Sequence, residues 1–301
     1  MTEAPEPTTD VRAAPTARFS VLRSLYWSVR RELWEHRMVQ IAPPTVAAVV
    51  LLGFLLTMGG LSRRVREATA GGPGGDLLTP YSFLAMALIV TGFLVGSLYG
   101  LAALHAERRD RGLLFWKSMP VSDLTTVAAK AVVPLAVLPA IVWAVTVATH
   151  LVMLLIATLV VLAGGSSVAT LWGHLPLGRI WAILAYGLLI NALWHAPIYG
   201  WFLLVSGWAR RTPLLWALAP PLALMIIEHL AFKGSAIRLW LIHRVTGAPA
   251  EAFVQGGKGL GRLPQLDPLK FLSAPGLWGG LVLAMVFLAA AVWQRRRRQP
   301  I

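Results

Sequence analysis

Five polar side chains stand inside long apolar stretches of this sequence: His150, Asn191, His195, Glu228 and His229. Polar groups at membrane depth usually face a partner or a wet cavity, so each is a candidate functional residue. Asn191 and His195 are four residues apart and share a helix face, whereas the adjacent Glu228 and His229 cannot. The pattern favours hydrogen bonding between helices or the lining of a pathway. The candidate lining residues are Asn191, His195, Trp201, Glu228 and His229.

Catalysis by these residues would most plainly be zinc-dependent hydrolysis within the membrane. His150, His195 and His229 offer imidazole ligands, and Glu228 offers a general base. The HExxH spacing that places two histidines and a base on one helix face is absent. We therefore expect no metal site and no catalytic residue, and an intramembrane metalloprotease is the enzyme alternative.

Cofactor binding has little support in the sequence. The glycine-rich stretch GGKGLGR, residues 256–262, lacks the GxxxxGK[ST] spacing of a phosphate-binding loop and follows no strand pattern. The absence of cysteine excludes thiolate metal sites and cysteine nucleophiles. We expect neither ATP-binding machinery nor a cofactor in this chain.

Small and aromatic residues recur at helical spacing. Gly92, Gly96 and Gly100 put small residues on one face, which lets another backbone approach closely, either across a dimer seam or within the same subunit. Trp194, Trp201 and Trp208 also share a face. These rings could line a route for apolar cargo, although core packing or an interfacial belt is the commoner role.

The composition indicates that lipid is the main solvent. Hydrophobic residues make up 57% of the 301 positions and charged residues only 13%. The formal net charge is +14, but the basic residues gather near the ends of apolar stretches, where topology and anionic headgroups explain them. We therefore expect membrane lipids as partners and no nucleic acid.

The elements that carry these residues are predicted to be membrane-spanning helices, because about twenty apolar residues are enough to cross the hydrocarbon layer. Residues 40–294 form the expected six-span domain of an all-α membrane protein. The third span is long enough to tilt, to project beyond the bilayer, or to break at Pro134 or Pro139. The six predicted spans are residues 40–61, 80–104, 127–162, 179–208, 213–232 and 275–293.

The segments around the spans complete the expected architecture. Residues 1–20 are rich in Pro, Thr and Ala and are predicted to be a disordered tail. Residues 21–39 form an amphipathic helix that lies along the membrane surface. Residues 233–274 form a long external loop, and residues 295–301 a basic tail. Placing the amino terminus in the cytoplasm puts most Lys and Arg inside, and an even number of spans then puts both termini there.

Residues 106–123, AERRDRGLLFWKSMPVSD, interrupt the apolar sequence in an ordered way. Charges from Glu107 and Arg108 onward mark where the second span leaves the lipid, and Gly112 permits a change of direction. A short amphipathic piece with Leu113 and Trp116 follows, and Pro120 prevents its continuation. Ser122 or Asp123 can cap the next helix. The segment is predicted to be a short cytoplasmic helix between spans two and three.

This arrangement resembles the permeases of the type-2, exporter-like ABC transporter superfamily. They have six spans, an amphipathic helix before the first span, and a coupling segment ending in S-x-P-V-S between spans two and three. The stretch RRELWEHR at 30–37 is similar to the family's first helix. The matching coupling residues are Glu107, Arg108, Gly112, Leu113, Ser118, Pro120, Val121 and Ser122, with Lys130 opening span three.

The resemblance implies the permease subunit of an exporter in the bacterial inner membrane. Two permease subunits, identical or different, pair with two cytoplasmic ATPase subunits that bind ATP and magnesium. Leu113, Trp116 and Met119 are then the apolar contacts to the ATPase, and Glu107 and Arg108 belong to a charged rim. A non-catalytic membrane scaffold is the remaining alternative, in which the charged segment only fixes topology.

Overall fold

The computed structural model describes residues 21–69, 77–109, 122–254 and 264–297. Nearly all of these residues are helical, and six helical segments are long and apolar enough to cross a membrane, as the sequence predicts. They comprise Met38–Leu56, Thr79–Glu107, Asp123–Ala163, Val168–Trp208, Pro213–Phe232 and Pro275–Arg297. The chain therefore has the architecture of an all-α, multi-pass membrane protein.

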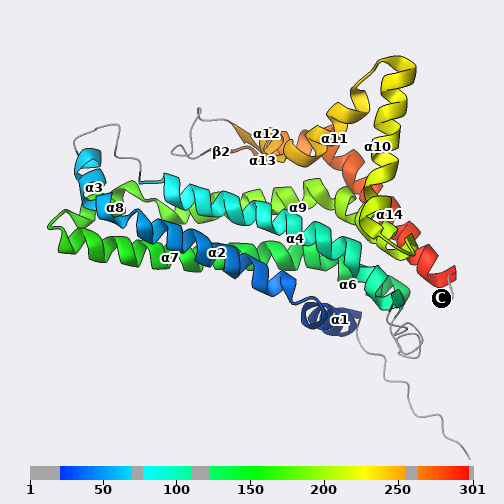
Figure 1. The fold of residues 1–301 in the computed structure, drawn as a ribbon, viewed down its shortest axis with the longest axis horizontal. Helices are drawn as coiled ribbons and strands as arrows, with labels where there is room; N and C mark the ends of the chain where they lie inside the picture. Colours follow the sequence, from blue (N-terminus) through cyan, green and yellow to red (C-terminus); the bar gives the residue numbers. More distant parts are fainter. Residues whose placement is uncertain (1–20, 70–76, 110–121, 255–263, 298–301) are drawn as a thin grey trace, which may run out of the picture.

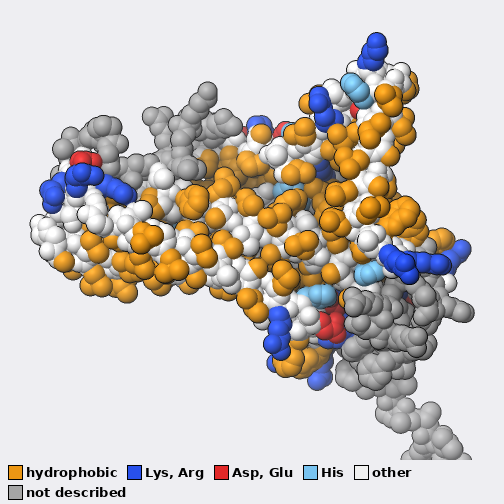
Figure 2. Space-filling view, in the orientation of Figure 1, with side chains coloured by type: hydrophobic (Ala, Val, Ile, Leu, Met, Phe, Trp, Pro, Cys, Tyr) orange, Lys and Arg blue, Asp and Glu red, His pale blue; other side chains and the backbone are white. Residues whose placement is uncertain are grey.

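Four long helices form the body of the molecule: α2 (Met38–Leu56), α4 (Thr79–Arg109), α7 (Leu138–Ala163) and α9 (Leu177–Trp208). They lie side by side in Figure 1, and α14 (Pro275–Arg297) crosses α9. Leu84, Leu88, Val142 and Met153 are fully buried in the core between them. Figure 2 shows apolar side chains along the sides of the body and basic side chains towards its ends, which is the distribution expected of a protein embedded in lipid.

The third predicted span is continuous but irregular. Helix α6 (Asp123–Val132) passes through the π-helical turn η2 (Val133–Val137) into α7 without a break. Pro134 lies in η2 and Pro139 just after it, and each lacks the N–H that would bond the carbonyl four residues earlier. The wider turn accommodates both prolines, as local π adjustments do in membrane helices.

Shorter elements lie at the two ends of the body. Helix α1 (Val21–Glu35) is at one end; η1 (Met58–Gly60), α3 (Leu61–Thr69) and α8 (Val168–His174) are at the other. Residues 21–39 are not one helix, because α1 ends at Glu35 and α2 starts at Met38. Val29 and Leu33 of α1 pack on the core, whereas Trp27 and Trp34 are exposed.

Helix α10 (Pro213–Phe232) rises away from the body in Figure 1. Thr212 and Lys233, at its two ends, have φ of 48° and 49°, a left-handed conformation that is uncommon for residues other than glycine. Ala217 is its buried residue, so the apolar surface of α10 is almost entirely exposed. The expected 233–274 loop contains α11 (Ala236–Thr246), α12 (Ala248–Ala252), strands β1 (Phe253–Val254) and β2 (Gln265–Leu266), which pair antiparallel, and α13 (Pro268–Ser273).

Candidate functional site

The ends of four helices, α1, α4, α6 and α14, meet at one place. Each contributes a charged side chain to one buried cluster. Glu32 comes from the last turn of α1, Glu107 from the end of α4, Lys130 from the last turn of α6 and Arg295 from the end of α14. Glu32 is 1% exposed, Glu107 7% and Lys130 0%. Buried charges are tolerated only where they are paired and hydrogen-bonded, so the contacts of this cluster define the geometry of this end of the molecule.

Lys130 is the centre of the cluster. Its Nζ donates to Glu32 Oε1 at 2.8 Å and to the backbone oxygen of Ala103 at 2.9 Å, and lies 3.1 Å from Glu107 Oε1. An ammonium group has three donors, and these three acceptors account for all of them. Lys130 therefore ties α1 and the end of α4 to the last turn of α6.

Arg295 makes the second junction. Its Nη1 donates to Glu107 Oε2, and its Nε donates to Asp123 Oδ1 at 2.9 Å. Asp123 is the first residue of α6, whose N-cap Ser122 accepts from the N–H of Thr125 at 3.1 Å. Glu107 and Asp123 lie on either side of residues 110–121, so one guanidinium from α14 holds both ends of the predicted coupling segment.

A more exposed layer joins α1 to the cluster. Arg31 Nη2 donates to Glu32 Oε1 and to Glu107 Oε1, both at 3.0 Å. The Tyr99 hydroxyl of α4 donates to Glu32 Oε2 at 2.9 Å, and its ring meets that of His36 edge to face. Burial lowers the pKa of His36 more than the nearby Glu32 raises it. Burial raises the pKa of Glu35 more than Arg31 lowers it. His36 thus favours its neutral form.

The predicted coupling residues fall into two groups. Glu107 is in the cluster, and Arg108 lies in the last turn of α4. Gly112, Leu113, Trp116, Met119 and Pro120 lie outside the described residues. Sequence reasoning missed Glu32 and Arg295 as members of this site. The available signal was one acidic residue between Val29 and Leu33 on the apolar face of α1, together with one lysine in an apolar span. Buried charges of opposite sign usually pair with one another, so the two residues could have been predicted to be in contact.

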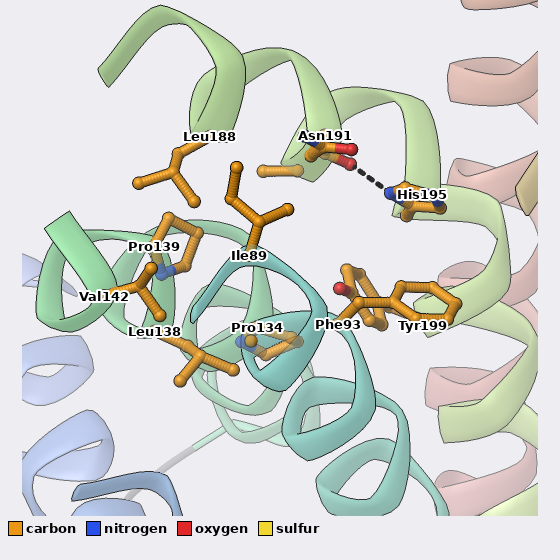
Figure 3. Close-up of a pocket in the computed structure, with 12 residues that line it drawn as sticks. Ile89, Phe93, Pro134, Leu138, Pro139, Val142, Leu188, Asn191, His195 and Tyr199 are labelled. Atoms are coloured by element: carbon orange, nitrogen blue, oxygen red, sulfur yellow. Dashed lines mark hydrogen bonds between the residues drawn. The ribbon is translucent and has the colours of Figure 1, made fainter. Parts of the chain in front are cut away.

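Asn191 and His195 line one small cavity of about 30 Å³ between α4, η2, α7 and α9, drawn in Figure 3. His195 Nδ1 lies 2.8 Å from the Asn191 backbone oxygen, and Nε2 lies 3.0 Å from the backbone oxygen of Val245. Asn191 Nδ2 donates to the Gly187 oxygen at 2.9 Å. The cavity is the size of about one water molecule, so these side chains serve helix contacts in this conformation.

The glycine stripe of α4 packs within this chain. A Cβ on Gly92 would lie 3.2 Å from Val142, one on Gly96 3.1 Å from the Tyr199 ring, and one on Gly100 3.2 Å from Phe202. The three glycines therefore let α4 approach α7 and α9. These contacts lie inside the subunit, which is one of the two alternatives for this stripe.

The remaining candidate residues are not brought together. Trp201 Nε1 donates to the Ala217 oxygen at the start of α10. Glu228 accepts from the N–H groups of Ala236 and Ile237, at 2.7 and 2.9 Å, and so caps α11. His229 is exposed on α10.

His150 is held by two partners within the core. Its Nδ1 accepts from Trp181 Nε1 at 3.2 Å, and its Nε2 lies 3.0 Å from the Tyr81 oxygen. The proposed zinc set is thus divided among separate contacts. Among the described residues, Glu32, Glu35 and His36 are close enough to one another to suit a metal, but Glu32 is already bound to Lys130.

Comparisons with known proteins add no relative: no protein-family model and no curated protein matches the chain. The chain is therefore characterised by its architecture, a multi-pass helical membrane protein with a buried ionic cluster where α1, α4, α6 and α14 meet.

Proposed function

We propose that this chain is the membrane-spanning permease subunit of an ATP-driven exporter of the type-2 ABC superfamily, located in a bacterial inner membrane. ATP and magnesium bind a separate cytoplasmic ATPase, and the permease itself catalyses no reaction. The observation that carries the proposal is the position of Arg295, which binds Glu107 and Asp123 on either side of residues 110–121.

A segment can transmit motion from a partner only if its ends are fixed to parts that move with the transport pathway. Glu107 ends the second span, Asp123 begins the third, and Arg295 ends the sixth. A push on residues 110–121 would therefore act on three spans together. Lys130 extends the same junction to α1 through Glu32.

A scaffold with a charged segment that only fixes topology needs no such junction. Positive charge in a loop is sufficient to orient a span. Here the acidic residues on both sides of the segment are buried or partly buried, and their carboxylates bind an arginine of another helix rather than facing solvent. This arrangement favours a mechanical use of the segment.

The test is co-expression with the ABC ATPase encoded beside this chain, followed by purification through a tag on the permease. We expect an ATP-hydrolysing complex for the native chain. Leu113→Ala combined with Trp116→Ala should lose the ATPase while the permease remains in the membrane. Native association of this double variant, or failure of any ATPase to co-purify with the native chain, contradicts the proposal.

Arg295→Met separates contact from transmission, because it leaves residues 110–121 unchanged. We expect this variant to retain the ATPase but to lose the effect of the permease on the rate of ATP hydrolysis. Arg296→Met is the matched control, since Arg296 is exposed on the same last turn of α14. Equal behaviour of the two variants would show that the Arg295 junction has no part in coupling.

A further inference from the structure

The carboxyl-terminal turn of α11 is bound to the body of the protein through three contacts. Trp194 Nε1 of α9 donates to the His243 oxygen at 3.4 Å, and His195 Nε2 lies 3.0 Å from the Val245 oxygen. Between these two carbonyls, Arg244 reaches α14, where its Nη1 donates to the Gly276 oxygen at 2.9 Å. Arg244 is thus the side chain by which α11 contacts the first turns of α14.

Arg244 is a buried cation with an incomplete set of partners. It is 4% exposed, and its guanidinium carbon lies 4.7 Å from the centre of the Trp194 ring. Its Nε and Nη2 have no hydrogen-bond partner among the described residues. These two nitrogens form the edge of a guanidinium that binds two oxygens of one carboxylate or phosphate side by side.

No acidic side chain of the described residues pairs with Arg244. The neighbouring His243 Nε2 lies 3.6 Å from Glu251 Oε1, and this contact does not include the guanidinium. Burial lowers the pKa of Arg244, with no compensating carboxylate. Burying Nε and Nη2 without an acceptor is costly, because these two N–H groups have lost water and gained no partner in its place.

The surroundings of Arg244 favour negative charge. The first N–H groups of a helix have no carbonyl partner within it and carry partial positive charge, and Gly276 belongs to the first turn of α14. A Cβ on Gly280 would lie 1.2 Å from Arg244 Nη2, so this glycine is required for the arginine to reach α14. The unpaired edge of the guanidinium and the start of α14 would therefore both bind the same kind of group, an oxyanion.

The exposed residues of α11 and of the start of α14 include aromatic and apolar side chains. Trp240 and Val245 on α11 and Trp278 on α14 are 51%, 46% and 56% exposed. Tryptophan at such positions is typical of the headgroup level of a membrane. Figure 2 shows apolar side chains over the α10–α11 region, which suits acyl chains better than water.

We propose that Arg244 and the start of α14 form a binding site for the phosphate group of a membrane lipid. The phosphate accepts from Nε and Nη2 of Arg244 while the acyl chains lie along the exposed apolar residues of α11. Both nitrogens are buried in this structure and Nη2 lies against Gly280, so binding requires the arginine side chain to move away from Gly280. Lipid binding at this site does not require the ATPase partner. Its failure in an experiment would therefore be distinguishable from a failure of the proposed transport function.

The experiment measures lipid-dependent thermal stability of the full purified chain after delipidation in detergent. Phosphatidylglycerol should raise the melting temperature, whereas diacylglycerol of the same acyl composition, which lacks the phosphate, should not. Arg244→Gln should lose this response. Arg238→Gln is the matched control, because Arg238 is exposed on the same helix and should respond as the native chain does.

A second variant covers the case in which Arg244→Gln does not fold. Arg244→Lys keeps the charge but not the paired N–H edge, and should bind phosphatidylglycerol at least about tenfold more weakly. Stabilisation of the native chain by inorganic phosphate alone would support the oxyanion site with a soluble source. Equal stabilisation by diacylglycerol, or undiminished phosphatidylglycerol binding by both Arg244 variants, would overturn the proposal.

Discussion

Replacing Lys130 by methionine tests whether the buried ionic cluster holds α1 in place. The change keeps the length of the side chain but leaves the carboxylates of Glu32 and Glu107 without the ammonium group between them. At the 2.8 Å separation of Nζ and Glu32 Oε1, Coulomb's law with an effective dielectric constant of about 20 gives roughly 6 kcal/mol of attraction. Desolvation offsets part of this, and removing one partner of a buried pair costs about 3–5 kcal/mol.

The loss should be local, because Lys130 binds α1 to a body that has its own core. A local cost of about 3–5 kcal/mol speeds amide hydrogen exchange by roughly 10²- to 4 × 10³-fold. We therefore expect this acceleration in α1 of Lys130→Met, measured by hydrogen exchange with mass spectrometry in detergent. Adding Glu32→Gln should restore part of the protection, because it removes the uncompensated charge. Exchange in α1 within a few-fold of the native rate would refute the reasoning.

Three further predictions concern packing, protonation and capping. Gly96→Val should destabilise the chain by about 1–3 kcal/mol in thermal unfolding, because its Cβ would meet the Tyr199 ring and Pro134, whereas Gly53→Ala, with nothing within 4 Å, should cost no stability. Because burial lowers the pKa of His36 below its ordinary value of 6.5, docked α1 binds fewer protons than undocked α1. The packing of α1 on the body should therefore be strongest above pH 6.5 and weaken as the pH falls towards 6. Hydrogen exchange in α1, corrected for its intrinsic rate, should become faster over this range, and His36→Gln should abolish the change. Glu228→Gln should weaken the start of α11 by about 1 kcal/mol, measured as faster exchange of Ala236 and Ile237, and unchanged exchange there would contradict the capping role.

The helices were accessible to sequence reasoning because hydrophobicity and length alone determine which segments can cross a membrane. The fifth predicted span, 213–232, coincides with α10. The 233–274 segment was harder, because its helices are short and depend on contacts made elsewhere. Glu228 caps α11 from the preceding helix, and Trp194 and His195 of α9 bind its other end. None of these contacts leaves a local sequence pattern.

The candidate site was only half predictable for a similar reason. Glu107 stood out because it lies in a run of charges after a span, and Lys130 because of the family resemblance. Arg295 is 188 positions from Glu107, and the sequence accounts for it fully as part of a basic terminal run. Its neighbour Arg296 is exposed, so only the three-dimensional arrangement distinguishes the arginine that binds Glu107 and Asp123 from the one that faces solvent.

The most direct test of coupling is a cross-link between residues 110–121 and the ATPase. The chain has no cysteine, so Lys117→Cys introduces a unique reactive site. Arg63→Cys is the control, at an exposed position of α3 and at the other end of the body from α1. We predict that Lys117→Cys cross-links to the ATPase in membranes, with a yield that changes when a non-hydrolysable ATP analogue is added, and that Arg63→Cys does not cross-link. Labelling of residue 117 by an impermeant reagent from outside the cell, or no cross-link with either variant, would contradict the account.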